Sequence, residues 1–283
     1  MGNNTCYLCG NKKLKLVADQ DWPIKKCRKC HLIQVNPLPS IKQVNTLYRG
    51  DYWKSLSSYG KQFLTHEKYF QKKINEIKKY KLSGRLLDIG CALGSLLKIA
   101  QKEGFKGEGL DISDFAVKQC RSFGLSATQG VISNIKKKRY YDIITAFEVI
   151  EHELDPILTI KTIYSLLKKN GLFVMTVPNS GTLIGKIMGS KWFGYRNKEH
   201  IFHFTFETLR LVLKKSGFRD INITTDINRQ YLFTHYLDRF NFYLIKSKTL
   251  KKFIDFLKKI PFVNSLVVPF NPWSNIIVYA YKK

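Results

Sequence analysis

Four of the six cysteines lie in two close pairs near the N-terminus. Each pair has the spacing C-x2-C, which lets two thiolates point at one ion across a tight turn, and two such turns complete a tetrahedron. Seventeen residues separate the pairs, which is within the range of four-thiolate zinc sites. Chance pairing and a redox-active C-x-x-C are the alternatives. The spacing predicts one structural zinc ion with these ligands: Cys6, Cys9, Cys27 and Cys30.

A second group of reactive side chains lies near the middle of the chain, where Glu148, Glu151 and His152 follow an apolar run at 140–146. An imidazole can accept a proton near neutral pH, and carboxylates together with imidazole can hold a divalent ion. If the run is a strand of an open α/β sheet, these side chains stand at its carboxyl end, where such sheets bind ligands. The pattern predicts proton transfer or metal-assisted chemistry there.

A glycine-containing turn precedes this group. A buried strand leads into Gly90 and Gly94, and glycine is needed where the backbone takes a positive φ or approaches a ligand closely. A second strand ends in Asp111, 21 residues after Gly90, where a Rossmann-like unit carries its ribose-binding carboxylate. The order Asp88-x-Gly90-x-x-x-Gly94 lacks the G-x-G-x-x-G of dinucleotide-binding folds, so it predicts a different cofactor.

The elements that must position these residues alternate between strand and helix patterns. We expect an α/β fold, a Rossmann-like doubly wound and mostly parallel seven-stranded sheet, with a small zinc ribbon at the N-terminus. The expected strands are 85–90, 107–111, 126–130, 140–146, 172–177, 221–225 and 276–281, and the expected helices are 95–101, 158–167 and 206–215. The last two strands would close the sheet as an antiparallel pair.

These motifs resemble class I S-adenosylmethionine-dependent methyltransferases. The turn resembles their motif I, with Ala92 in place of the usual middle glycine, and residues 147–156 closely match their E-x-x-E-H-x-x-D-P signature. Relatives that carry a small zinc ribbon are common among bacterial enzymes of glycan and natural-product pathways. The resemblance implies that S-adenosylmethionine is bound by these residues: Asp88, Gly90, Cys91, Gly94, Asp111, Ile112 and Phe147.

The E-x-x-E-H element resembles that of ubiquinone-biosynthetic O-methyltransferases and of small-RNA 2′-O-methyltransferases, in which two Glu and two His hold a divalent ion. The second histidine would be His200, with His203 as the next choice. The resemblance implies the catalytic set Glu148, Glu151, His152 and His200, with a divalent ion or with His152 as the base. Many relatives keep the motif for packing around the cofactor, without a metal.

The resemblance divides the chain into a zinc-ribbon module at 1–38, a helical N-terminal cap at 39–83 and a methyltransferase domain at 84–283, with a lid insertion at about 231–272. The insertion carries an apolar stripe at helical spacing with lysines beside it. The stripe residues are Leu250, Phe253, Ile254 and Leu257. Two interpretations remain: a lid helix packed on the core, or an interfacial helix on anionic lipid.

Composition narrows the setting. The formal net charge is +27 over 283 residues, which indicates either a functional basic face or compositional drift toward lysine. No apolar run approaches the roughly 18 residues of a membrane span, the first residues are polar, and the cysteines do not suggest a secreted disulfide scaffold. We expect a cytoplasmic protein, with peripheral contact at an anionic membrane as the variant.

Three functions follow from these patterns. The first is O-methylation of a small or lipid-linked acceptor, such as a sugar, a glycan or a quinone. The second is RNA methylation, which the charge favours, although RNA recognition usually adds aromatic platforms that the ribbon lacks. The third is a cofactor-binding module without catalysis, against which the intact Asp88, Gly90, Gly94 and Asp111 argue.

Overall fold

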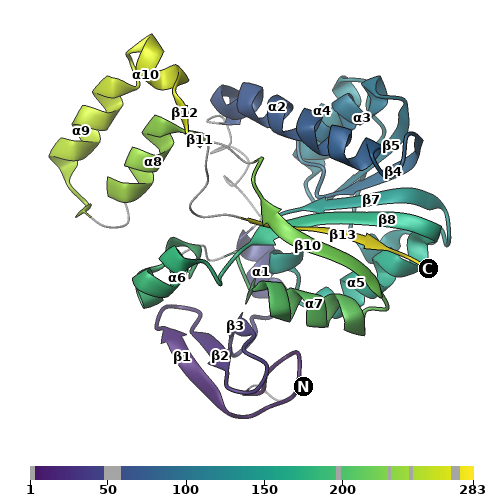
Figure 1. The fold of residues 1–283 in the computed structure, drawn as a ribbon, viewed down its shortest axis with the longest axis horizontal. Coiled ribbons are helices and arrows are strands. Elements are labelled where there is room, and N and C mark those ends of the chain that lie inside the picture. Colours follow the sequence, from purple (N-terminus) through teal and green to yellow (C-terminus); the bar gives the residue numbers. More distant parts are fainter. Residues whose placement is uncertain (1–3, 48–58, 196–198, 229–230, 242–244, 269–274) are drawn as a thin grey trace.

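The computed structural model describes residues 4–47, 59–195, 199–228, 231–241, 245–268 and 275–283. Its central element is a seven-stranded sheet in which β13 runs antiparallel to both neighbours and the other strands run parallel to one another (Figure 1). From edge to edge the strands are β10 (Asp220–Asp226), β13 (Asn275–Tyr281), β8 (Leu167–Pro178), β7 (Tyr141–Phe147), β4 (Gly84–Ile89), β5 (Phe105–Asp111) and β6 (Ala127–Gln129). The predicted Rossmann-like fold is confirmed.

Helices form a layer on each face of this sheet. One layer consists of α2 (Tyr59–Lys78), α3 (Ser95–Lys102) and α4 (Asp114–Ser122), and the other contains α5 (Pro156–Leu166) and α7 (Phe206–Lys215). Alternation along the strands supplies both cores: Leu86 belongs to the core beneath the first layer and Leu87 to the core beneath the second. One boundary differs from expectation. β8 begins at Leu167 rather than near Leu172, because Leu167 already pairs with Tyr141.

The N-terminal module does not close its own sheet. It contributes β1 (Leu14–Ala18), β2 (Ile24–Cys27) and β3 (Ile33–Val35), and β3 then pairs antiparallel with β9 (Phe202–His203) from the larger part of the chain. Buried ribbon residues such as Ile24 and Leu32 belong to the same core as Leu87. The module at 1–38 therefore shares both a sheet and a core with the larger part of the chain.

The segment expected as a helical cap contains α1 (Ile41–Leu47) and α2. The second half of α2 packs within the core on one face of the seven-stranded sheet, where Ile74 and Ile77 are fully buried. Lys73 is also buried, and its ammonium forms an ion pair with the buried carboxylate of Asp226 on β10, at 2.7 Å. This ion pair connects α2 to β10, which is an edge strand of the sheet.

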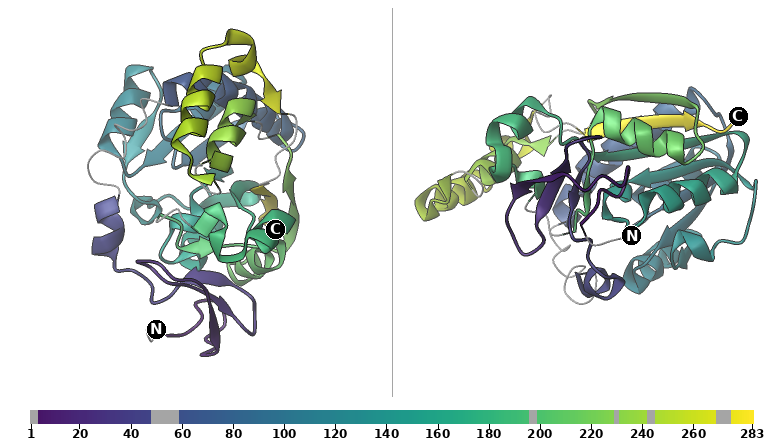
Figure 2. Two further views of the ribbon diagram at one scale, coloured as in Figure 1. Left: turned by 90° about the vertical axis from the view of Figure 1, so that its left-hand side faces the viewer. Right: turned by 90° about the horizontal axis from the view of Figure 1, so that it is seen from below.

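The insertion forms a helical hairpin beyond the carboxyl edge of the parallel strands (Figures 1 and 2). Its elements are β11 (Tyr231–Leu232), α8 (Phe233–Phe240), α9 (Lys248–Leu257), α10 (Pro261–Ser265) and β12 (Val267–Val268). The short strands β11 and β12 pair and close it. Within the described residues, none of the helices combines the length and apolar character that crossing a bilayer requires.

The buried ion pair gives a prediction about stability. Lys73→Met removes one charge and leaves the buried Asp226 carboxylate without its cation, so the free energy of unfolding should fall by about 3 kcal/mol or more. Lys78→Met on the same helix is the matched control. Lys78 pairs with Glu103 at the surface, so its loss should cost about 1 kcal/mol or less. Urea unfolding curves measure both, and equal losses would contradict the account.

Candidate active site

Three residues with left-handed backbone conformations shape the turn after β4. Gly90 has φ 69°, Ala92 has φ 47° and Gly94 has φ 77°. A Cβ on Gly90 would lie 2.6 Å from a methyl of Val149, and one on Gly94 would lie 2.6 Å from Leu125. Ala92 adopts a conformation that strains an L-residue, which explains why glycine is usual there in the family that the motif resembles. The backbone N–H groups of this turn lie at the carboxyl edge of the sheet.

Two buried acids frame the turn. One carboxylate oxygen of Asp111 accepts a hydrogen bond from the Ala92 N–H and the other accepts from the Ser113 N–H, both at 2.9 Å. Each oxygen retains a lone pair that could accept a ribose hydroxyl. Asp88 accepts a hydrogen bond from the Thr145 hydroxyl of the neighbouring strand at 2.7 Å. Burial raises the pKa of Asp111, and it raises that of Asp88 to about 7.

The other three predicted cofactor contacts differ in their accessibility. Cys91 points into the core, where its sulfur lies against Gly109, so only its backbone faces the turn. Ile112 is exposed directly after Asp111. Phe147 ends β7 and packs edge-on against Phe70 of α2, with ring centroids 5.7 Å apart. Thus α2 covers the edge of the predicted cofactor site.

The acid and histidine residues come together beside this turn. Glu151 and His152 lie in the short 3-10 helix at Ile150–His152 after β7, and His200 approaches from the segment before β9. Each of the three offers a ligand atom within 4.8 Å of the others. The imidazole rings of His152 and His200 are 4.8 Å apart, and the Nδ1 of His152 lies 2.9 Å from the carbonyl oxygen of Glu199.

The structure leaves two of the proposed ligands outside this group. The Glu148 carboxylate accepts a hydrogen bond from the side-chain amide of Asn275 on β13. His203 is buried with its ring 6.2 Å from that of His200, and it contacts Tyr195 instead. The four-residue set that includes Glu148 is therefore not assembled, whereas the trio of Glu151, His152 and His200 is.

Burial leaves the trio without charge near neutral pH. It raises the pKa of Glu151 to about 8 and lowers that of His152 to about 4, and His200 shifts in the same direction as His152. Neither carboxylate oxygen of Glu151 has a hydrogen-bond partner among the described residues. A buried carboxyl without a donor beside two neutral imidazoles is a set of groups that a cation would stabilise.

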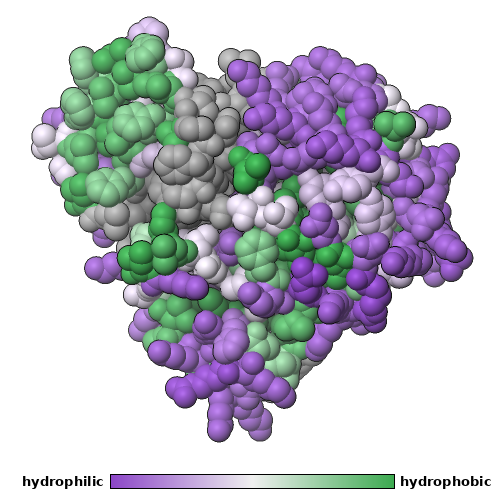
Figure 3. All heavy atoms as spheres, viewed as in Figure 1, coloured by the Kyte–Doolittle hydropathy of each residue, from purple (hydrophilic) through white to green (hydrophobic). Residues whose placement is uncertain are grey.

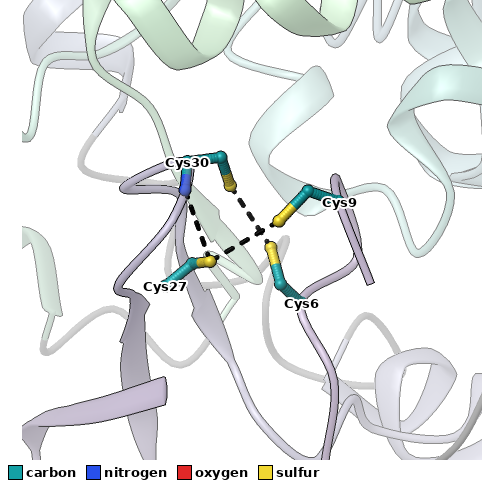
Figure 4. Close-up of side chains that lie close together, drawn as sticks. All are labelled: Cys6, Cys9, Cys27 and Cys30. Carbon is teal, nitrogen blue, oxygen red and sulfur yellow. Dashed lines mark hydrogen bonds between the residues drawn. The ribbon is translucent and has the colours of Figure 1, made fainter. Parts of the chain in front are cut away.

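The four ribbon cysteines converge, as Figure 4 shows. Their sulfurs all lie within 4.8 Å of one another, with Cys6 and Cys30 3.4 Å apart and Cys9 and Cys27 3.6 Å apart. A tetrahedron with Zn–S bonds of about 2.3 Å has sulfurs about 3.8 Å apart. The N–H groups of Lys29 and Cys30 point at the Cys27 sulfur, which favours its thiolate form.

Some residues that hold the site were not singled out from the sequence. Thr145, the partner of Asp88, is a polar residue within a buried apolar strand, and this contrast is a usable signal. Asn275 and Glu199 carry no such signal, because each acts on a residue far away in the chain. Asn275 contacts Glu148, 127 residues before it, and Glu199 contacts His152, 47 residues before it. Tyr7, between two cysteines, contacts the start of α5.

Comparison with known proteins identifies the family and supports the fold. A sequence model of the methyltransferase domain family matches residues 63–223, so the chain belongs to that family. Among solved structures, a possible histamine N-methyltransferase from Thermotoga maritima superimposes with a TM-score of 0.55 at 16% identity, covering 81% of this chain and 97% of that one.

Other relatives extend the comparison. The ubiquinone biosynthesis O-methyltransferase of Nitrosospira multiformis is 27% identical over 125 residues, 40% of this chain and 52% of that protein. The enzyme of the same name from Yersinia enterocolitica is 29% identical over 106 residues, 35% of this chain and 44% of that protein. The chain thus spans about half the length of these curated relatives. A Haemonchus contortus phosphoethanolamine N-methyltransferase superimposes with a TM-score of 0.54 at 16% identity, over 95% of this chain and 71% of that one.

The buried Asp88 gives a prediction about pH. Because burial raises its folded-state pKa to about 7, the folded protein keeps a proton that the unfolded chain loses near pH 4. Stability should therefore fall as pH rises from about 4 to about 7, by up to about 1.4 kcal/mol per pH unit. Asp88→Asn keeps the bond with Thr145 and should lessen this slope by the share of Asp88, leaving the share of Glu151, whose pKa is also raised by burial. Unfolding curves at pH 5, 6 and 7 test it, and an unchanged slope in the variant would contradict the assigned pKa.

Proposed function

We propose that this enzyme methylates an oxygen of a small, lipid-linked acceptor of the quinone or glycan type. The observation that carries the proposal is the trio of Glu151, His152 and His200, which lies beside the glycine turn at the carboxyl edge of the sheet. An oxygen nucleophile, unlike a free amine, must lose a proton during methyl transfer, and this trio offers the groups for that task. RNA methylation and cofactor binding without catalysis have no comparable observation in their favour.

The cofactor is proposed to lie across the turn at Gly90–Gly94. The ribose hydroxyls would bind the Asp111 carboxylate, and the exposed Ile112 would contact the adenine. Asp88 would lie near the methionine end, where the positive charge of the cofactor favours an ionised carboxylate. The turn's N–H groups and Phe147 complete the proposed set.

The trio has the chemistry of a divalent metal site. Glu151 is fully buried and its two oxygens lack donors among the described residues, and both imidazoles are neutral at pH 7 because burial lowers their pKa values. Metal ligation needs an ionised carboxylate and neutral imidazoles. We propose that Glu151, His152 and His200 hold the ion, without Glu148. A bound divalent ion would lower the pKa of the acceptor hydroxyl.

The low pKa of His152 separates the two roles considered for it. A base whose conjugate acid has a pKa near 4 takes little of a hydroxyl proton at pH 7. Its neutral imidazole is, in contrast, a good metal ligand. The contact between its Nδ1 and the Glu199 carbonyl is the hydrogen bond usually found behind a ligating histidine, so Nε2 would face the ion.

The turn and the trio together would carry out an in-line displacement. The acceptor oxygen forms a bond to the methyl carbon while the carbon–sulfur bond breaks, S-adenosylhomocysteine leaves, and the hydroxyl proton goes to solvent or to a carboxylate of the site. Because the cofactor is already activated, the main contribution of the chain is alignment, which can supply several kcal/mol. Glu151 is buried, and the His152 and His200 side chains are only partly exposed, which limits the access of competing water.

The ribbon is proposed to hold one structural zinc ion. The sulfur geometry fits a tetrahedral ion, and the four thiols leave no open coordination position. A zinc ion there would supply folding free energy to a module with a small core.

The hairpin favours an acceptor that resides in a lipid surface. Along α9, only Ile254 of the predicted stripe is fully buried, as α9 packs on α8, whereas Phe253 and Phe256 are 55% and 58% exposed. Other exposed apolar side chains lie elsewhere in the hairpin and on α6 (Leu183–Met188). They are Phe240 on α8, Ile245 between α8 and α9, Phe262 on α10, and Leu183 and Ile187 on α6. Figure 3 shows these apolar surfaces over α8–α10 and α6 at one end of the molecule.

Charge on α9 supports an anionic surface. At about 100° per residue, Lys248 and Lys252 fall on one side of α9, adjacent to Phe256, and Lys259 lies two residues after the end of this helix. No described carboxylate forms an ion pair with these three lysines, whereas Lys251 and Lys258 pair with Asp238 and Asp255. An apolar strip bordered by free lysines is typical of a helix that lies in the headgroup region of an anionic bilayer.

Turnover tests the proposed chemistry. Wild-type protein with labelled S-adenosylmethionine is screened against lipid, aqueous and RNA extracts, and we expect label in the lipid extract. His152→Ala should lower turnover on that acceptor by roughly a hundredfold or more, with cofactor affinity within twofold. His31→Ala, at an exposed ribbon histidine, is the control. Label in RNA, or near-normal turnover by His152→Ala, would contradict the proposal.

Chelation separates the metal role from the base role in the same assay. After EDTA treatment, zinc is restored in an amount sufficient for the ribbon alone. If Glu151, His152 and His200 use a metal, turnover should return only when a second divalent ion such as Mg²⁺ is added. Full recovery with one equivalent of zinc would contradict the metal site.

Vesicle flotation tests the proposed membrane surface without any need for turnover. Protein should bind vesicles that contain phosphatidylglycerol more tightly than pure phosphatidylcholine vesicles, and Phe253→Ser/Phe256→Ser should lower binding by at least about tenfold. Phe123→Ser is the matched control, because Phe123 is similarly exposed but follows α4 at the opposite edge of the sheet. Equal losses in both variants, or no preference for anionic vesicles, would contradict the surface.

A further inference from the structure

Backbone hydrogen bonds connect the N-terminal ribbon to the proposed catalytic trio. The Val35 N–H of β3 donates to the Ile201 carbonyl at 2.9 Å, and the Ile201 N–H donates to the Glu151 carbonyl, also at 2.9 Å. Ile201 is fully buried and directly follows His200. Ile201 is thus hydrogen-bonded both to the ribbon and to Glu151. These bonds fix the backbone directly beside His200.

The pairing of β3 with β9 extends this path. Ile33 is in register with His203 and Gln34 with Phe202, so the last strand of the ribbon directs the backbone that carries His200. The two-residue strand β9 has no other partner strand in its sheet. Since a strand this short has little intrinsic stability, its geometry depends on β3 together with the bonds that the flanking Ile201 and Phe204 make to Glu151 and Ser180.

Tyr7 makes a second connection, from between two of the proposed zinc ligands. Its ring packs on Phe202, with centroids 5.0 Å apart. Its hydroxyl accepts a hydrogen bond from the Ile157 N–H at 3.0 Å and donates one to Asp155, whose carboxylate caps α5. Tyr7 therefore contacts both sides of the trio, the segment after His152 and the segment after His200.

We propose that the zinc ribbon is a structural part of the acceptor site, which sets the position of Glu151 and His200, and that Tyr7 is a positioning residue for them. The inference rests on the proposed role of the trio in methyl transfer. The ribbon's backbone bonds run to Ile201 and through it to Glu151, whereas the cofactor turn leads into α3, whose core residues such as Leu97 pack on the other face of the sheet. Only β4 contributes to both clusters among the elements that flank this turn, with Leu87 in the cluster that includes the ribbon. Loss of ribbon structure should therefore disturb the trio and spare the cofactor site.

Hydrogen exchange of the zinc-loaded full chain measures this coupling directly. In Cys27→Ser, the amides of Ile201 and His203 should exchange roughly a hundredfold faster or more, because opening of the ribbon exposes them. Amides in β4 and β5 should keep their protection, and calorimetry should give an affinity for S-adenosylmethionine within twofold of wild type. Leu16→Ser, at an exposed position of β1, is the control and should change none of these. Retained protection at Ile201 while the ribbon exchanges freely would overturn the proposal.

Two substitutions at Tyr7 keep the inference testable if Cys27→Ser fails to fold. Tyr7→Phe loses the hydroxyl alone, so exchange should accelerate at the Ile157 amide and remain near wild type at Ile201. Tyr7→Leu loses the ring as well, and exchange should accelerate at both amides. Unchanged exchange at Ile201 in Tyr7→Leu would overturn the positioning role.

Turnover adds a readout that general destabilisation does not predict. On the acceptor found by labelling, Tyr7→Leu should lower kcat by about tenfold or more with KM for the cofactor within twofold, and Tyr7→Phe should recover most of the loss. If amide exchange changes but kcat does not, the ribbon positions the trio and the trio does not act in the reaction, which contradicts the proposed function. If amide exchange at Ile201 does not change, the inference about the ribbon itself is contradicted.

Discussion

The parallel pairing of β4 with β5 and β7 is the constraint on which the site depends. It places Asp88 beside Gly109 on one side and Thr145 on the other, and it brings the ends of three strands to one edge. Each functional segment starts at that edge: the glycine turn after β4, Asp111 at the end of β5, and the Glu-His element after β7. A shift of one residue in this register would turn Asp88 toward the opposite face and separate the groups.

Burial then determines the chemistry at that edge. Asp88 and Glu151 are buried carboxyls whose pKa values are raised to about 7 and about 8, and the His152 imidazole, whose Nε2 lies 4.0 Å from a Glu151 oxygen, is neutral at pH 7. Such groups are costly unless a cation joins them. The positive charge of bound S-adenosylmethionine would lie near Asp88, and a divalent ion would bring positive charge to Glu151. The methyltransferase site is in this view a set of neutral acids that become ionised when their ligands bind.

The sequence predicted most of this arrangement, because its signals are local. Runs of apolar residues located the strands, the side chain of Thr205 capped α7 where expected, and the cysteine spacing brought four sulfurs together. The sequence could not predict the pairing of β3 with β9, since a strand of two residues has no periodicity. Nor could it predict that Glu148 would turn to Asn275, because that contact joins segments 127 residues apart. The stripe on α9 had the right period, yet its outer residue Phe253 faces outward because α8 covers only part of the helix.

The ionisation of Glu151 is the most direct test of this account. Titration calorimetry with Mg²⁺ or Mn²⁺ at pH 7, in buffers of different ionisation enthalpy, counts the protons released as the ion binds. With the ribbon zinc loaded, the wild-type protein should release about one proton per ion, because Glu151 with a pKa of about 8 must lose its proton to ligate. Glu151→Gln should bind the ion weakly and release none. Binding without proton release, or equal binding by the variant, would contradict a site built on this buried carboxyl.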